Sequence, residues 1–119
     1  MDRRSLGTWG EEQAARYLKL RAYRILDMNY RCRHGEIDII ARRGKYIVFV
    51  EVKLRKNDDY AAAREFVNYP KQQRIITTAQ LYLQEHNMEL QPRFDVIEIY
   101  APNGSEGKIK IEHIENAFM

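Results

Sequence analysis

A chain of 119 residues, of which 45% are hydrophobic and 31% charged, is long enough for one domain with a hydrophobic core but too short for two, so we expect a single domain over residues 1–119. The net charge of +3 is too small to indicate a nucleic-acid partner by itself. No apolar stretch reaches the ~20 residues of a membrane span, the N-terminus lacks the apolar core of a secretory signal, and the single cysteine fits a reducing environment, so we expect a cytoplasmic protein with no membrane partner.

The first half of the chain predicts one helix followed by three strands. Apolar residues from Trp9 to Ala22 recur at helical spacing, which predicts a helix over residues 8–21. Residues 23–30 have the composition and alternation of a strand. Two further strands, rich in Ile and Val, are expected over residues 36–42 and 46–54, with a turn at Arg43-Gly44 between them.

The second half predicts a loop, a helix and two strands. Residues 57–60 are polar and are expected to form the most mobile loop, followed by a short helical turn over residues 61–66. Pro70 suits the opening of a second helix because its missing N–H costs nothing there, and Asn87 suits the end of that helix near residue 86. Strands are expected over residues 93–100 and 108–114. The α-β-β-β-α-β-β order predicts an α/β fold with a mixed β-sheet flanked by helices.

Two neighbouring predicted strands carry the most chemically specific residues of the chain. Glu36 and Asp38 lie on one strand, and Glu51 and Lys53 on the next. Side chains alternate along a strand, so each pair shares one face. Two carboxylates with a nearby ammonium can hold a divalent cation and prepare a water for attack on a phosphodiester. The alternative is an exposed strand face, where alternating Glu and Lys are common.

The register of this hairpin decides whether the acids meet. With a two-residue loop at Arg43-Gly44, Glu36 faces Glu51, and Asp38 is a diagonal neighbour of Glu51 on the same face. A three-residue loop would put Asp38 and Glu51 on opposite faces unless a bulge intervened. A shared site therefore predicts an even loop or a compensating bulge.

Basic residues are concentrated around these acids. A few carboxylates within a basic surround are what a metal-dependent enzyme acting on a polyanion needs, whereas the alternative is a solvated basic face. The basic residues of this stretch are Arg31, Arg33, Arg42, Arg43, Lys45, Lys53, Arg55 and Lys56. Cys32 and His34 also lie here, but two ligands without a second pair fall short of a zinc pattern.

The two acidic segments and the order of elements resemble the PD-(D/E)XK nuclease superfamily. The segments are Gly35-Glu36-Ile37-Asp38 and Glu51-Val52-Lys53. More narrowly, the chain resembles the YraN-like family of small uncharacterised bacterial proteins, which are similar to archaeal Holliday junction resolvases. The narrower match covers nearly the whole chain, including residues 10–15, 29–33, 48–53, 71–72, 93–96 and 116–118. The resemblance implies a restriction-endonuclease-like core.

The resemblance also implies a role for each residue of the pattern. Asp38 and Glu51 would coordinate Mg²⁺ or Mn²⁺, with the Val52 carbonyl as a third ligand. Lys53 would orient or help to deprotonate the attacking water and stabilise charge on the phosphate. Glu11 matches an acid that resolvase-like nucleases carry near the metal, although residues 8–11 also fit a helix capping box.

Other positions are less strongly assigned. The superfamily's usual proline before the first acid is absent, and Glu36 is either a supporting acid or a paired surface residue. Lys71 and Gln72 begin the second helix, where related nucleases keep a polar residue facing the site, and a surface or phosphate-contacting role is equally open for them.

The implied function is a metal-dependent endonuclease that hydrolyses DNA, with branched DNA as one expected substrate and a homodimer as the matching assembly. The alternative is a nucleic-acid-binding module that keeps the fold without cutting. The residues expected to contact nucleic acid are Arg31, Arg33, Arg42, Arg43, Arg55, Lys56, Lys71, Gln72 and Arg74. A third option is a partner-binding protein with Tyr60, Phe66 and Tyr69 as an exposed patch.

Overall fold

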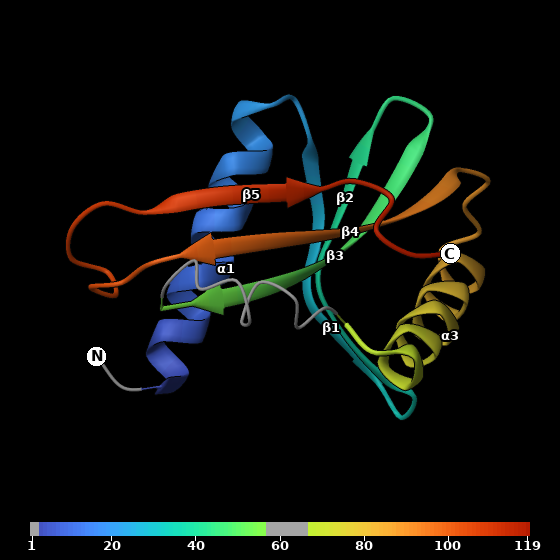
Figure 1. Cartoon of the computed structure of the whole chain (residues 1–119). Coiled ribbons are helices and arrows are strands. Elements are labelled where there is room, and N and C mark those ends of the chain that lie inside the picture. The colour runs from blue at the N-terminus through green and yellow to red at the C-terminus, as the bar shows by residue number, and fades with distance from the viewer. Residues whose placement is uncertain (1–2, 57–66) are drawn as a thin grey trace.

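The computed structural model describes residues 3–56 and 67–119 (Figure 1). The predicted loop at residues 57–60, the helical turn at 61–66, and the patch residues Tyr60 and Phe66 lie outside the described residues. The elements are α1 (Arg3–Leu20), β1 (Arg24–Cys32), β2 (Gly35–Arg43), β3 (Tyr46–Arg55), α3 (Tyr69–Glu85), β4 (Gln91–Tyr100) and β5 (Lys110–Ile114). This confirms the predicted α-β-β-β-α-β-β order. Helices within the described ranges lack the length and apolar character needed to span a membrane.

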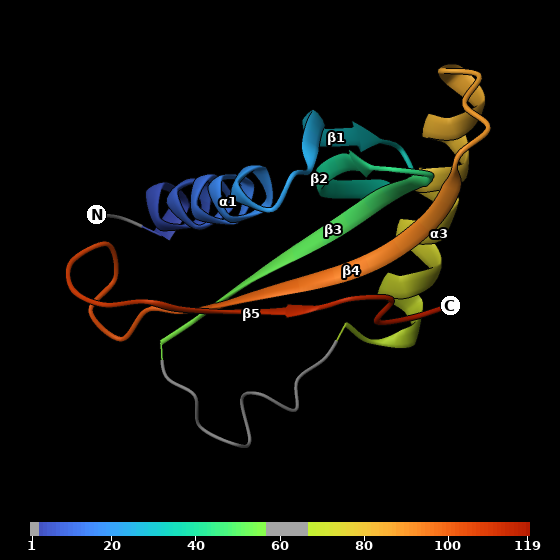
Figure 2. The ribbon, with the colours of Figure 1, turned by 90° about the horizontal axis from the view of Figure 1, so that it is seen from above.

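The five strands form one mixed sheet in the order β1-β2-β3-β4-β5. Among the described strands β3 and β4 run parallel, and the other neighbours are antiparallel. A parallel pair needs a crossover connection, and α3 lies in the segment that joins β3 to β4. Figures 1 and 2 show α1 and α3 on opposite sides of the sheet. The predicted mixed sheet flanked by helices is therefore confirmed.

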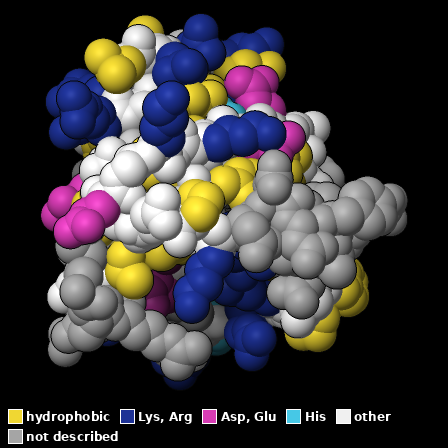
Figure 3. Space-filling model, turned by 60° about the vertical axis from the view of Figure 1, so that its left-hand side comes forward, with side chains coloured by type: hydrophobic (Ala, Val, Ile, Leu, Met, Phe, Trp, Pro, Cys, Tyr) yellow, Lys and Arg dark blue, Asp and Glu magenta, His cyan; other side chains and the backbone are white. Residues whose placement is uncertain are grey.

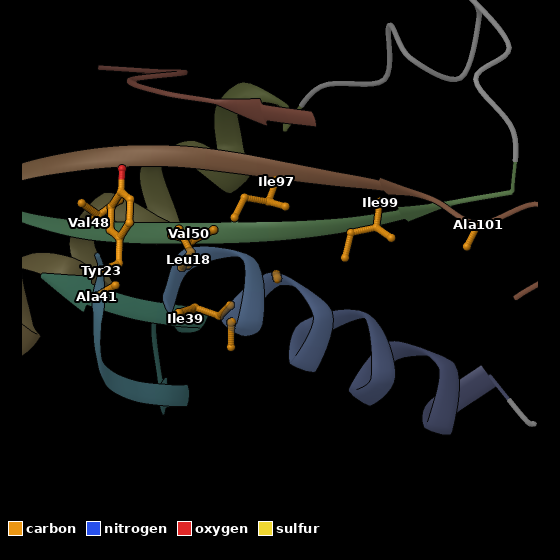
Figure 4. Packing of buried hydrophobic residues seen from close by; sticks show 11 residues of the cluster. Leu18, Tyr23, Ile39, Ala41, Val48, Val50, Ile97, Ile99 and Ala101 are labelled. Carbon is orange, nitrogen blue, oxygen red and sulfur yellow. The ribbon is translucent and has the colours of Figure 1, made fainter. Parts of the chain in front are cut away.

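A hydrophobic core lies on each face of the sheet. Ala14 and Leu18 of α1 pack against Val48 and Val50 of β3 in the first core, shown in Figure 4. In the second core, the buried face of α3 packs against the alternate residues of β3, which are Ile47 and Phe49. The middle of β3 is thus covered on both faces, which explains why its sequence is continuously apolar rather than alternating.

The β2–β3 hairpin has an even loop, as predicted, but the loop lies one residue further along the chain. Arg43 pairs with Tyr46, so the loop residues are Gly44 and Lys45 rather than Arg43 and Gly44. Gly44 has a φ of +59°, a value that glycine adopts without steric cost, so it suits the first loop position. The predicted pairing of Glu36 with Glu51 is consequently wrong.

The observed register brings Asp38 closer to Glu51 than predicted. The last pair of the β2–β3 ladder is Ile39 with Val50, so the next position on each strand is Asp38 and Glu51. Beyond this pair the Val52 N–H donates a 2.9 Å hydrogen bond to Asp38 Oδ2 instead of to a strand carbonyl. The two acids are therefore directly adjacent at the point where the ladder ends.

The start of α3 is fixed by local capping. Asn68 is the N-cap, and its side-chain oxygen accepts a 3.0 Å hydrogen bond from the Lys71 N–H. Pro70 lies in the first turn, as predicted. The helix ends at Glu85, and Asn87 follows with a φ of +49°. These caps fix where α3 begins and ends, and its first turn lies beside the end of the β2–β3 ladder, where Lys71 contacts Glu51.

Candidate active site

Asp38 and Glu51 line the same pocket, which lies between β2, β3 and the first turns of α3. Its volume is about 340 Å³. Glu51 is buried, with 7% of its surface exposed, although it carries a carboxylate. The lining residues are Gly35, Glu36, Asp38, Glu51, Lys71, Arg74 and Ile75. The structure thus brings together the two acids that the sequence proposed as metal ligands.

Asp38 is in an environment that disfavours its charged form. Burial and the nearby Glu51 carboxylate raise the pKa of Asp38 from 3.8 to about 7, with smaller contributions from Glu11 and Glu36. The hydrogen bond from the Val52 N–H acts in the opposite direction but is not sufficient to offset them. A proton or a cation relieves the repulsion between two poorly solvated carboxylates that lie this close together.

Two lysines compensate part of this negative charge. The Lys71 Nζ lies 2.6 Å from Glu51 Oε1, and the Lys53 Nζ lies 3.8 Å from the same oxygen. Burial lowers the pKa of Lys53, and the neighbouring Lys71 ammonium lowers it further. Burial also disfavours the charge of Lys71, but the hydrogen bond and ion pair with Glu51 raise its pKa overall. Lys71 is therefore the stronger partner of Glu51, a contact that the sequence did not specify.

Glu11 approaches the same charges from α1. Burial raises the pKa of Glu11, as do the carboxylates of Glu36 and Glu51, whereas a hydrogen bond with Asn29 lowers it. The alternative role in a capping box is wrong, because α1 begins at Arg3 and Thr8 lies inside the helix. Glu11 is thus a fourth acid within electrostatic range of the pocket.

Some of the predicted basic residues lie near the pocket. Arg74 lines it directly, one turn along α3 from Lys71. Arg31 pairs with Glu36 at 3.4 Å at the β1–β2 end, and Arg33 is exposed nearby. The Gln72 side chain donates a hydrogen bond to the Val67 carbonyl, which secures the start of α3.

Other predicted basic residues do not converge on the pocket. Arg42 and Arg43 lie at the opposite end of β2, roughly 14 and 17 Å along the strand from Asp38 at ~3.4 Å per residue. Arg55 forms a 3.3 Å ion pair with the buried Glu98, and Lys56 is exposed after it. Figure 3 shows Lys and Arg in several separate groups on one face of the molecule, with other side chains between them.

The structure also contains a buried acid network that sequence reasoning missed. Asp95 on β4 is fully buried, accepts hydrogen bonds from Arg93 at 2.8 and 2.9 Å, and lies 2.6 Å from His113 Nε2. The Asn116 N–H donates to it as well, at 3.0 Å. The available signal was an acid inside an apolar strand, two residues after an arginine on the same face. This network lies on the α1 side of the sheet and does not line the pocket.

The donor set of the pocket fits a divalent cation only in part. Two adjacent carboxylates, with one oxygen of Asp38 not held by Val52, match the oxygen ligands that Mg²⁺ and Mn²⁺ prefer. However, within residues 3–56 and 67–119 no cluster of three or more His, Cys, Asp or Glu side chains is arranged to hold a metal. The remaining ligands would have to come from a backbone carbonyl, such as that of Val52, and from water.

Comparisons with known proteins identify the family of the chain. Residues 10–99 match the model of the uncharacterised protein family UPF0102. A UPF0102 protein from Caldanaerobacter subterraneus subsp. tengcongensis is 42% identical over 99% of this chain and 98% of its own length. Similar proteins from Alkaliphilus oremlandii (48% identical, 97% of this chain and 98% of its own length) and Geobacter sulfurreducens (46%, 95% and 88%) also carry the UPF0102 name. The chain therefore belongs to the uncharacterised UPF0102 (YraN) family.

Proposed function

We propose that this UPF0102 protein is a metal-dependent endonuclease that hydrolyses DNA phosphodiester bonds. The observation that supports this most is the adjacency of Asp38 and Glu51 in one pocket, with two lysine ammonium groups beside Glu51. Adjacent carboxylates, of which Glu51 is buried and Asp38 half-buried, raise the electrostatic energy of the folded protein. If the site binds a divalent cation and then a polyanionic substrate, the cation offsets the repulsion between the two carboxylates, which explains why the fold keeps them together.

In this proposal Asp38, Glu51 and the Val52 carbonyl hold Mg²⁺ or Mn²⁺. The bound ion would lower the pKa of its water and polarise the phosphate oxygens. Lys53 would hold the attacking water by a hydrogen bond at its Nζ, and its lowered pKa would ease the transfer of a proton through that atom. Glu11 would either accept a hydrogen bond from the same water or add negative charge beside Asp38 and Glu51.

The basic residues at the rim have a separate role. Arg74 and Lys71 line the pocket, so their side chains would contact the phosphate that enters it. Arg31 and Arg33 would contact neighbouring phosphates of the same strand. Because a junction presents two symmetric strands, a C2 homodimer would place one pocket on each strand.

The test of this proposal is cleavage of linear, flapped and four-way DNA by the purified protein in Mg²⁺ or Mn²⁺. We expect cutting that is lost, by at least a hundredfold, in Asp38→Asn and Glu51→Gln, because each change removes a carboxylate that holds the ion. Glu11→Gln tests the fourth acid, and its matched control is Glu12→Gln, which alters the exposed neighbour on the same helix. Equal cutting by wild type and Asp38→Asn would refute the proposal, and so would the absence of cutting on every substrate.

The second candidate is a module that binds nucleic acid without cutting it. One observation favours it: the Lys71 ammonium lies 2.6 Å from Glu51 and balances the charge of one of the two acids. Affinity for DNA would then fall steeply with salt and would not depend on divalent cations. Binding that is unaffected by EDTA, together with no cleavage, would select this candidate.

A further inference from the structure

Among the described residues, the contact between Lys71 and Glu51 is the shortest ion pair at the pocket. The Lys71 Nζ lies 2.6 Å from Glu51 Oε1, while the side chains are 37% and 8% exposed respectively. Both residues line the pocket together with Asp38. The ammonium therefore lies on the side of Glu51 that a ligand entering the pocket would reach.

The same ammonium interacts with both acids. Besides its contact with Glu51, Lys71 lines the same pocket as Asp38, so its positive charge also faces the Asp38 carboxylate. Lys53 contributes less to Glu51, since its Nζ is 3.8 Å from the carboxylate oxygen. One positive charge from α3 thus acts on the two carboxylates that would hold a divalent ion.

We propose that Lys71 is a built-in counter-ion of this site, which a divalent cation must displace from Glu51 in order to bind. The inference rests on the metal-binding part of the proposed function. A divalent cation that binds Glu51 from the pocket would lie close to the ammonium that is 2.6 Å from Glu51 Oε1, so the two positive charges compete for the same carboxylate. A divalent ion shared by two carboxylates replaces a monovalent ammonium bound mainly to one, so exchange is favoured once the ion is abundant.

The position of Lys71 allows this exchange without moving the backbone. The Lys71 N–H is held by the Asn68 cap, which fixes the first turn of α3. The side chain has a flexible four-carbon stem, so a change of rotamer is enough to release Glu51. Arg74 lines the same pocket one turn further along. The released ammonium would then join Arg74 at the rim, where it is available to a phosphate.

This arrangement couples the cation to the polyanion. Before exchange, the Lys71 ammonium is paired with Glu51 and contributes little to phosphate binding. After exchange, the divalent ion would balance the negative charge of Asp38 and Glu51, and the Lys71 ammonium would be able to contact a phosphate. By linkage, a phosphate that attracts Lys71 also increases the affinity of the acids for the divalent ion.

The test is a calorimetric or EPR titration with Mn²⁺ alone, which does not depend on cleavage. We expect Lys71→Met to bind Mn²⁺ about tenfold more tightly than wild type, a size typical of coupling between two sites. Lys71→Arg keeps a positive charge and should stay near the wild-type affinity. Lys108→Met removes an exposed lysine in the β4–β5 connection and serves as the matched control. Circular dichroism confirms that each variant is folded, and Lys71→Gln replaces Lys71→Met if that variant is not.

The outcomes separate this inference from the proposed function. Equal Mn²⁺ affinity in wild type and Lys71→Met, with loss of binding in Glu51→Gln, would overturn the counter-ion role and leave the metal site in place. Tighter binding in Lys71→Met without cleavage of any DNA would support the counter-ion role and count against the nuclease. No Mn²⁺ binding by any variant would overturn both.

Discussion

At the scale of single residues, the pocket is defined by carboxylates that are close together and poorly solvated. Asp38 and Glu51 follow the last pair of the β2–β3 ladder, and among the described residues the lysine ion pairs at this point are with Glu51. Lys71 provides the strongest compensation, but it acts mainly on Glu51. Asp38 therefore bears most of the electrostatic cost, and functional sites commonly carry such a cost in stability.

Asp38→Asn should stabilise the metal-free protein at high pH. The pKa of Asp38 in the folded protein is about 7 against an ordinary 3.8, so the contribution of this one group to stability is fully present below the lower value and is lost as the pH rises through about 7. The amide removes the charge yet can still accept the hydrogen bond from Val52. We expect a gain in the free energy of unfolding of about 2 kcal/mol at pH 8 that vanishes near pH 4, measured by urea unfolding in EDTA.

Asp27→Asn provides the control for this prediction, because the Asp27 side chain accepts a hydrogen bond only from the neighbouring Met28 N–H among the contacts seen for it. It should leave the pH dependence unchanged. A gain in Asp38→Asn that is the same at pH 4 and pH 8 would mean that charge repulsion is not its cause.

The sequence could predict the acids of the pocket but not their lysine partner. Asp38, Glu51 and Lys53 were identifiable because strand alternation and one short hairpin relate them. Lys71 lies in a different element, and its contact depends on how the crossover helix docks on the sheet. Strand periodicity carries no information about that docking, so the 2.6 Å contact with Glu51 required the structure.

At the scale of elements, the β2–β3 hairpin shows that the sequence predicts the length of a loop better than its position. The even loop was predicted, and parity alone was enough to place Asp38 and Glu51 on one face. The position of the loop was missed because Arg43-Gly44 and Gly44-Lys45 are both two-residue choices. The structure has Gly44 first, where its positive φ is accommodated, and Arg43 remains in the strand.

The first turn of α3 is the element on which the position of Lys71 depends. Asn68→Ala removes the side-chain oxygen that accepts from the Lys71 N–H. We expect a loss of about 1 kcal/mol in the free energy of unfolding, measured by thermal or urea denaturation. Asn68→Asp retains a capping oxygen and should stay close to wild type. Equal losses in the two variants would show that capping is not what Asn68 supplies.

At the scale of the whole molecule, the candidate site lies on one face of the sheet and a buried stabilising network lies on the other. The α3 side carries the pocket with Asp38 and Glu51. The α1 side carries the buried network of Asp95, in which His113 of β5 also lies 3.3 Å from the hydroxyl of Tyr17 in α1. That network joins a helix, two strands and the C-terminal segment, so it stabilises the fold around the pocket without entering it.

The Asp95 network should make the stability of the whole domain sensitive to acid. Although burial acts to raise it, the hydrogen bonds from His113, Arg93 and the Asn116 N–H hold the pKa of Asp95 below its ordinary 3.8. A lowered pKa means that this stabilisation is complete above the ordinary value and is lost as the pH falls through the folded one. The wild-type free energy of unfolding should therefore decline below about pH 4.

Asp95→Asn should be less stable than wild type by about 3 kcal/mol at pH 7, because Arg93 loses its buried charge partner. The same variant should lose little more stability on acidification, since the group that titrates has been removed. Urea unfolding at pH 7 and pH 3 measures both effects, and Glu112→Gln, an exposed acid on β5, should retain the wild-type slope. If Asp95→Asn instead keeps the full acid sensitivity of wild type, the acid response belongs to other carboxylates, and the network holds the two faces together by packing and hydrogen bonds rather than by charge.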